Sequence, residues 1–270
     1  MNWMKVLTTT AETARKEVLE LFRSESVSKI LGVGAGGDLT RQIDATAEHT
    51  IVNSLREQHV QFTLISEEAG VESFGERPRF FVVLDPIDGT TNAIRGVPFF
   101  ATSIGISATA RLTGMEAGLV MDLLNGTTFV AEKGRGAFLG NVSLKPSATV
   151  DVEKALVGVD LNAPRSEEVL LRTLKLFRKV DKLRHLGANA LELCYVASGA
   201  YDSFVDIRGR LRVTDVAAAW LILLEAGGVM LTPEGKELDV PLTPTQRVSF
   251  VAAGNKELCE KILGLVETSL

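Results

Sequence analysis

The chain has 270 residues, with 29 Lys or Arg against 34 Asp or Glu, so its net charge at pH 7 is −5. This mildly acidic balance argues against a protein that binds nucleic acid non-specifically, because such binding needs surplus cations. A hydrophobic fraction of 46% with 23% charged residues is ordinary globular composition and excludes a disordered chain.

Cysteine usage and apolar runs bear on the cellular location. The two cysteines, Cys194 and Cys259, form no Cys-x-x-Cys pair, which is typical of a protein in a reducing compartment. The N-terminal segment lacks the apolar core of a secretory signal. The longest apolar run, 216–224, is shorter than the ~20 residues that a membrane helix needs. We therefore expect a cytoplasmic protein that binds neither membrane nor nucleic acid.

In the first part of the chain, helices are followed by strands. Apolar residues at helical spacing predict helices over 7–22 and 38–57, the second with Asp38 or Thr40 as its N-cap. The glycine-rich run between them, residues 32–37, predicts a mobile loop. Asn125-Gly126 predicts a tight hairpin between the last two strands. The expected strands are 62–66, 80–85, 102–107, 118–122 and 127–132.

In the second part, strands and helices alternate, which is typical of an α/β arrangement. Strands are expected at 155–160, 228–231 and 249–252, and helices at 166–177, 188–198, 213–226 and 256–266. The polar segment 145–154 suggests a boundary. We therefore expect an N-terminal α+β half over 1–148 and a C-terminal α/β half over 149–270, with the active site where the halves meet.

The sharpest motif is Asp85-Pro-Ile-Asp88-Gly-Thr-Thr, which follows the apolar run 80–84. Ligands bind at the carboxyl ends of strands in α/β sheets, and Pro86 is expected to end the strand and turn both carboxylates into one space. Asp88 is a candidate N-cap of a short helix, whose first amides, those of Gly89 and Thr90, would suit a phosphate. Alone, the motif could also be an ordinary Asp-Pro turn.

Further acids stand at the ends of other predicted elements. Glu67 and Glu68 follow the strand 62–66, and Asp215 opens a helix that is apolar on every face and therefore buried. Taken singly, these acids could be a solvated loop pair and a residue that complements the helix dipole. Asp44, taken singly, is expected on an exposed helix face.

Taken together, the acids at element ends (Glu67, Asp85, Asp88 and Asp215) suggest a metal site. Carboxylates that converge in a low dielectric repel one another unless a hard cation neutralises them. Oxygen ligands without His or Cys favour Mg²⁺ or Mn²⁺ over zinc. Paired ions of this kind assist the hydrolysis of phosphate esters.

These motifs, in this order and spacing, resemble the inositol monophosphatase family, whose members are magnesium-dependent phosphatases. The matching segments are Glu67-Glu68, Asp85-Pro-Ile-Asp-Gly-Thr-Thr-Asn92, and Thr214-Asp215 opening a helix that ends Glu225-Ala-Gly-Gly228. The family usually has Trp before this last Asp, where the chain has Thr214. The resemblance implies an α-β-α-β-α sandwich, a homodimer, and two or three Mg²⁺ ions whose place Mn²⁺ can take.

The resemblance also implies roles for single residues. The implied metal ligands are Glu67, Asp85, the carbonyl of Ile87, Asp88 and Asp215, with Asp44 linked to a third ion. The implied catalytic residues are Glu67, Thr90 and Asp44, of which Glu67 and Thr90 orient the attacking water. The implied substrate contacts are Asp88, Gly89, Thr90, Arg184, Ala188 and Arg210. The implied reaction is direct attack of a metal-activated water on phosphorus.

The substrate follows less directly. The segment 204–215, which carries Arg208, Arg210 and Arg212, resembles the archaeal-type bifunctional fructose-1,6-bisphosphatase/inositol-1-phosphatase. Arginine binds phosphate bidentately, so Arg210 or Arg184 could hold the second phosphate of a bisphosphate; each could equally be a solvated surface residue. We expect hydrolysis of fructose 1,6-bisphosphate and inositol 1-phosphate. The alternatives within the family are 3′-phosphoadenosine 5′-phosphate and histidinol phosphate.

Two other classes stay open. Gly32, Gly34 and Gly37 match the dinucleotide fingerprint G-x-G-x-x-G, which would indicate an oxidoreductase, but the preceding segment 24–31 is polar and no clear βαβ unit surrounds the match. A non-catalytic scaffold with the same fold is the other class, and the full set of acids argues against it.

Overall fold

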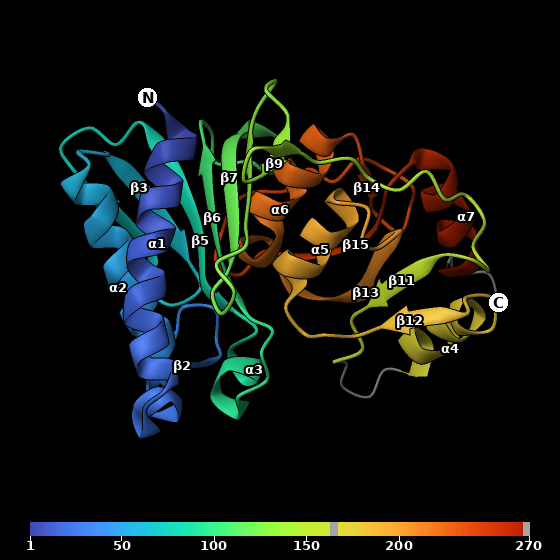
Figure 1. The fold of residues 1–270 in the computed structure, drawn as a ribbon, viewed down its shortest axis with the longest axis horizontal. Coiled ribbons are helices and arrows are strands. Elements are labelled where there is room, and N and C mark those ends of the chain that lie inside the picture. Colours follow the sequence, from blue (N-terminus) through green and yellow to red (C-terminus); the bar gives the residue numbers. More distant parts are fainter. Residues whose placement is uncertain (163–166, 267–270) are drawn as a thin grey trace.

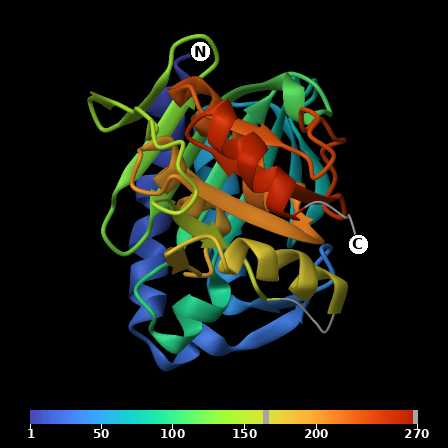
Figure 2. The same cartoon turned by 90° about the vertical axis from the view of Figure 1, so that its right-hand side faces the viewer.

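The computed structural model describes residues 1–162 and 167–266. The elements form five layers, helix–sheet–helix–sheet–helix (Figure 1). The outer helices α1 (Trp3–Phe22) and α2 (Gln42–Glu57) cover the larger sheet, and α5 (Asn189–Ala197) and α6 (Val213–Ala226) lie between the two sheets. On the opposite outer face, α4 (Glu167–Phe177) and α7 (Lys256–Val266) cover the smaller sheet (Figure 2). The layered α/β fold that the resemblance implied is confirmed.

The larger sheet has eight strands in the order β10-β9-β8-β7-β6-β5-β3-β4. Neighbouring strands of this sheet are antiparallel except for β3 and β5, which run parallel, with Ser66 opposite Leu84. The C-terminal ends of these two strands therefore meet at one edge of the sheet. The strands are β3 (Phe62–Ser66), β4 (Gly70–Phe74), β5 (Phe80–Asp88), β6 (Ala101–Ser107), β7 (Met115–Asp122), β8 (Thr128–Glu132), β9 (Ala137–Leu139) and β10 (Val142–Ser143).

The strand β5 continues through Pro86, which the sequence analysis expected to end it. On β6, Ser103 pairs with Asp85 and Ala101 pairs with Asp88, so Pro86 and the next residue together face a single residue of β6. This is a β-bulge, a place where a sheet tolerates proline. Residues three apart in a regular strand face opposite sides; the extra residue of the bulge instead lets both aspartates face one cavity.

The smaller sheet has the order β12-β11-β13-β15-β14. Its longest strand, β13, was not predicted, although apolar Val205, Ile207 and Leu211 alternate there with charged residues. Its pairing register with β15 shifts between Asp206 and Leu211, around Gly209, which has φ +65°. The strand passes directly into α6. The strands are β11 (Leu156–Val159), β12 (Lys182–Arg184), β13 (Ser203–Arg212), β14 (Val229–Leu231) and β15 (Arg247–Ala253).

Both sheets pack on the middle helices and share one apolar core, to which Val83 of the larger sheet, Leu191 of α5, Val216 of α6 and Phe250 of the smaller sheet all contribute. The strands of the larger sheet lie within 62–143 and those of the smaller sheet within 156–253. The shared core fixes the relative position of the two sheets, because burial of this apolar surface stabilises the folded state.

The second helix begins later than predicted. Leu39–Arg41 form β2, which pairs with β1 (Ile30–Val33), so α2 starts at Gln42 with Arg41 as its N-cap. Neither Asp38 nor Thr40 caps it. The other long helices agree with the prediction within a few residues. Within the described ranges, no helix combines the length and apolarity that a membrane span requires.

Candidate metal centre and active site

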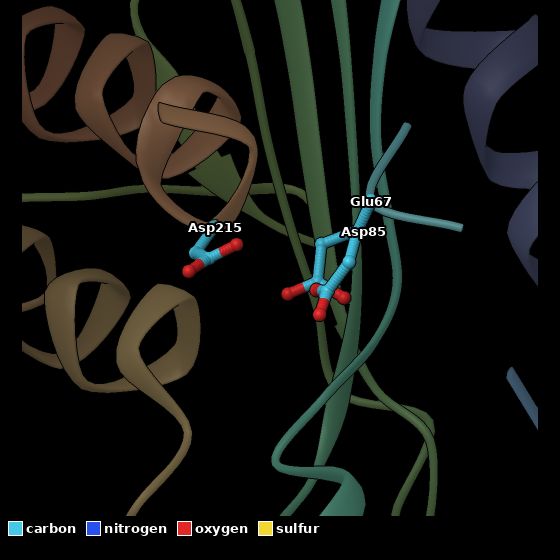
Figure 3. A group of neighbouring side chains, drawn as sticks. All are labelled: Glu67, Asp85 and Asp215. Atoms are coloured by element: carbon cyan, nitrogen blue, oxygen red, sulfur yellow. The ribbon is translucent and has the colours of Figure 1, made fainter. Parts of the chain in front are cut away.

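Three acidic side chains from distant parts of the sequence meet between the sheets. Glu67 directly follows β3, Asp85 lies on β5, and Asp215 lies in the first turn of α6. One carboxylate oxygen from each lies within 4.8 Å of the others. Figure 3 shows Glu67 and Asp85 side by side, with Asp215 facing them from the helix. The parallel pairing of β3 and β5 brings the first two together, and the packing of α6 against the sheet brings the third.

The electrostatics of this centre favour a bound cation. Burial, together with the charge of Asp215, raises the pKa of Glu67 to about 8, although the Arg212 guanidinium lowers it. Burial and the charges of Glu67 and Asp215 raise the pKa of Asp85 well above its usual range. Clustered carboxylates of this kind are stable in ionised form only next to positive charge. The all-oxygen donor set fits a hard divalent cation such as Mg²⁺ or Mn²⁺.

Asp88 lines the same cavity, and its carboxylate holds α5. It accepts hydrogen bonds from the backbone N–H groups of Asn189, at 3.0 Å, and Ala190, at 2.7 Å. The prediction that Asp88 caps the short helix α3 (Thr90–Arg95) is therefore wrong, and Gly89 takes that place with φ +87°. Burial, followed by the charge of Asp215, raises the pKa of Asp88 to about 8, against the effect of the α5 amides.

Asp44, Thr90 and the carbonyl of Ile87 form a second group beside the acids. The Thr90 hydroxyl lies 2.9 Å from Asp44 Oδ1 and 2.9 Å from the Ile87 carbonyl oxygen, and its single proton can serve one of these at a time. Asp44 is only 3% exposed, which corrects the reading that placed it on an exposed helix face. Because α2 begins after Arg41, Asp44 falls in its first turn, and burial raises the pKa of Asp44 to about 7.

The acids form one side of a cavity of about 890 Å³. Asp88, Gly89, Thr90 and Arg210 are the predicted substrate contacts that line it, and Arg210 is exposed there. The chain also places residues on the cavity wall that were not assigned as substrate contacts, among them Asn162, His185, Gly187 and Asn189.

Two predicted substrate contacts lie elsewhere. Arg184 is exposed, does not line the cavity, and donates a hydrogen bond to the Leu183 carbonyl. Ala188 is the buried N-cap of α5. A Cβ at Gly89 would come within 3.1 Å of the Ala188 Cβ, so Ala188 packs against the Asp88-Gly-Thr90 turn. Its neighbour Asn189 lines the cavity instead.

Two arginines have roles that sequence reasoning missed. Arg208 was a candidate phosphate ligand, but its side chain is 6% exposed, with Nη2 at 2.5 Å from Asp206 Oδ2 and 2.6 Å from Asp160 Oδ2. Arg212 is buried beside the acids, with Nη1 at 2.7 Å from Glu67 Oε1. The sequence carried only a general signal for the role of Arg212. Buried acids need a cationic partner, and Arg212 stands three residues before Asp215.

The glycine run joins the antiparallel strands β1 and β2. A dinucleotide fingerprint instead joins a buried parallel strand to a helix N-terminus, so the oxidoreductase reading is wrong for this segment. The loop lies on the acidic centre, where the Gly36 N–H donates to the Glu67 carbonyl at 2.7 Å and the Ala35 N–H to the Glu68 carbonyl at 3.0 Å. Its mobility stays a prediction.

Comparisons with known proteins agree with this geometry. The sequence model of the inositol monophosphatase family matches residues 2–270. The chain is 38% identical to a fructose-1,6-bisphosphatase/inositol-1-monophosphatase of Methanothermobacter thermautotrophicus, over 98% of this chain and 96% of that protein. It is also 30% identical to a bifunctional NADP phosphatase/NAD kinase of Methanococcus maripaludis, over 98% of this chain but 49% of that protein.

A solved structure gives the same result for the fold. The crystal structure of an inositol monophosphatase–fructose 1,6-bisphosphatase superposes with a TM-score of 0.87 at 31% identity, covering 98% of this chain and 100% of the other. The fold, the order of the acidic motifs and the match over nearly the whole chain lead to one assignment: this chain belongs to the inositol monophosphatase family.

Proposed function

We propose that the chain is a phosphoric monoester hydrolase that uses Mg²⁺ and acts on sugar or inositol phosphates, with fructose 1,6-bisphosphate and inositol 1-phosphate as its substrates. The observation that carries this proposal is the meeting of Glu67, Asp85 and Asp215 beside the Asp88-Gly-Thr90 turn. A non-catalytic scaffold has no need for buried acids that destabilise one another without a cation.

The metal ligands in this proposal are Glu67, Asp85, Asp88, Asp215 and the Ile87 carbonyl, with Asp44 at a third ion. When bound, Mg²⁺ supplies Lewis-acid charge and lowers the pKa of coordinated water. Glu67 and Thr90 orient the attacking water, and Asp44, 2.9 Å from the Thr90 hydroxyl, positions that hydroxyl. Gly89 and Thr90 contact the phosphate. Burial of Asp44, Asp85 and Asp88 at the cavity wall strengthens the charge interactions among the acids.

The lining of the cavity supports a substrate with a second anionic group. Arg210 and His185 line the same cavity as the acids, and guanidinium groups bind phosphate through paired hydrogen bonds. The names of the relatives include a fructose-1,6-bisphosphatase/inositol-1-monophosphatase and an NADP phosphatase. The second name makes NADP a further candidate substrate.

Arg210→Ala is expected to raise KM for fructose 1,6-bisphosphate about tenfold, because one charge-assisted contact of ~1.5 kcal/mol is lost, while KM for inositol 1-phosphate changes less than about twofold. Steady-state kinetics on both substrates measures this difference. Arg184→Ala is the matched control, since Arg184 is exposed and outside the cavity. Equal losses on both substrates would reject the specificity role.

A side-by-side assay tests the function itself. Phosphate release is measured with MgCl₂ and with EDTA on fructose 1,6-bisphosphate, inositol 1-phosphate, 3′-phosphoadenosine 5′-phosphate, histidinol phosphate and NADP. We expect turnover that depends on Mg²⁺, fastest on the first two substrates. Preference for NADP or for 3′-phosphoadenosine 5′-phosphate would replace the substrate assignment, and no turnover on any ester would favour a scaffold.

Three wider features belong to the same proposal. We assign the protein to the cytoplasm as a homodimer, and we place the division between its halves near residue 148. Sedimentation of the purified protein tests the dimer, and the expected result is one species of twice the mass of the chain.

A further inference from the structure

One buried side chain touches both the acidic centre and the glycine loop. Arg212, 7% exposed in its side chain, places Nη1 at 2.7 Å from Glu67 Oε1. Its Nη2 forms an ion pair with Asp38 and donates to the Gly36 carbonyl at 3.4 Å. A single guanidinium therefore links the loop 34–38, near the N-terminus, to the last residue of β13 and to the acid that follows β3.

The loop is shaped to fit this guanidinium. A Cβ at Gly36 would lie 2.7 Å from Arg212 Nε and 3.1 Å from Glu67 Cγ, so a larger residue could not occupy this position without a shift. The Gly36 carbonyl also accepts a hydrogen bond from Arg247 Nη2 at 3.3 Å. Among the described residues, Arg212 Nε is buried without a hydrogen-bond partner, so the terminal nitrogens alone make the contacts to the acid and the loop.

We propose that Arg212 is a positioning residue that latches the glycine loop over Glu67 and supplies a fixed positive charge to the acidic centre. A loop that contains Gly34, Gly36 and Gly37 loses much conformational freedom when it is ordered, so its closed form depends on contacts such as these. The buried Arg212 guanidinium provides them through its charge-assisted pair with Asp38 and its hydrogen bond to the Gly36 carbonyl. The latch depends on the proposed function in one respect only, that Glu67 is a metal ligand.

Hydrogen exchange of the metal-free, substrate-free protein tests the latch directly. The reporters are the amides of Gly34, Ala35 and Gly36, which donate to backbone carbonyls in the closed loop. We expect their peptide to exchange at least about tenfold faster in Arg212→Gln and in Asp38→Asn, with the peptides of β6 and β7 unchanged. The Asp38 side chain is 72% exposed, so this second variant reports on the loop even if Arg212→Gln fails to fold.

A double variant decides whether the two residues act through each other. If Asp38 works through Arg212, the double variant exchanges no faster than Arg212→Gln alone. Arg210→Gln is the control, because Arg210 lies two residues away on the same strand and faces the cavity; it is expected to leave loop exchange at the wild-type rate. Unchanged exchange in both single variants, or fully additive effects in the double variant, would overturn the latch.

Calorimetric titration with Mn²⁺ tests the fixed charge separately. Arg212→Gln removes a positive charge from the acids, so it is expected to bind Mn²⁺ several-fold more tightly, whereas Arg212→Lys keeps the charge and the wild-type affinity. Weaker binding by Arg212→Gln would overturn this part. If the wild-type protein bound no Mn²⁺ at all, the proposed metal centre would fail, while the exchange data would still decide the latch.

Discussion

Replacing Asp85 with Asn is expected to abolish phosphatase turnover and, in the same protein, to stabilise the metal-free fold. Asn keeps the shape of the side chain but removes a buried charge that faces Glu67 and Asp215. Loss of this charge weakens the binding of a divalent cation, and we expect kcat to fall by at least ~10²-fold, as when one transition-state contact is removed. Without the cation, the same loss relieves repulsion between the acids.

Thermal unfolding and kinetics measure both effects. In EDTA at pH 8, the Tm of Asp85→Asn is expected to equal or exceed that of the wild type, and MgCl₂ is expected to raise the wild-type Tm but not that of the variant. Asp122→Asn is the matched control. Asp122 is buried but accepts hydrogen bonds from the turn amides of Leu124 and Asn125, so this variant loses stability and keeps its response to MgCl₂. Near-normal turnover of Asp85→Asn would reject the metal assignment.

The stability of the metal-free protein is expected to fall as the pH rises from about 5 to about 9. Burial holds the pKa of Asp44 at about 7 and, with the charge of Asp215, those of Glu67 and Asp88 at about 8, whereas carboxyls in the unfolded chain titrate near ~4. Between these values the folded state binds more protons than the unfolded state. The free energy of unfolding therefore decreases with pH across this window.

Mg²⁺ is expected to reverse most of this loss, because it binds the ionised acids of the folded state alone. Burial also raises the pKa of Glu192 to about 7, and its carboxylate accepts a hydrogen bond from the Gly187 N–H rather than joining the acidic centre. A smaller decline between about pH 4 and about pH 7 should thus persist with MgCl₂. Calorimetry at several pH values, with EDTA or MgCl₂, checks both slopes; a Tm in EDTA that does not change with pH would contradict the raised pKa values.

Local signals were sufficient to predict much of the fold. The helix α6 occupies the predicted range, 213–226, because its residues are apolar on every face and Gly227, with φ +97°, ends it. The hairpin between β7 and β8 turns at Asn125-Gly126, where Gly126 has φ +75°. In both cases, residues adjacent in the chain determine the conformation, so the sequence carries the signal directly.

The sequence predicted which acidic residues belong to the site, but not the tertiary contacts that position them. Strand ends and a buried helix start were enough to select Glu67, Asp85, Asp88 and Asp215 as a set, because carboxylates that converge in a low dielectric need a cation. The bulge at Pro86 was not predicted, since a bulge depends on the pairing with β6. Similarly, the burial of Asp44 depends on a distant segment, the turn after β5, whose Thr90 hydroxyl lies 2.9 Å from Asp44 Oδ1.

By itself, the sequence determined the acids of the centre and the family through its motifs, and the layered fold class through the resemblance to that family. Only the tertiary structure decided which arginine each acid meets: Arg208 is held by Asp160 and Asp206, Arg212 by Glu67 and Asp38, and Arg210 stays exposed at the cavity. These three arginines occupy every second position of one strand. Their different partners follow from the strands and loops packed beside them, and these neighbours come from distant parts of the chain.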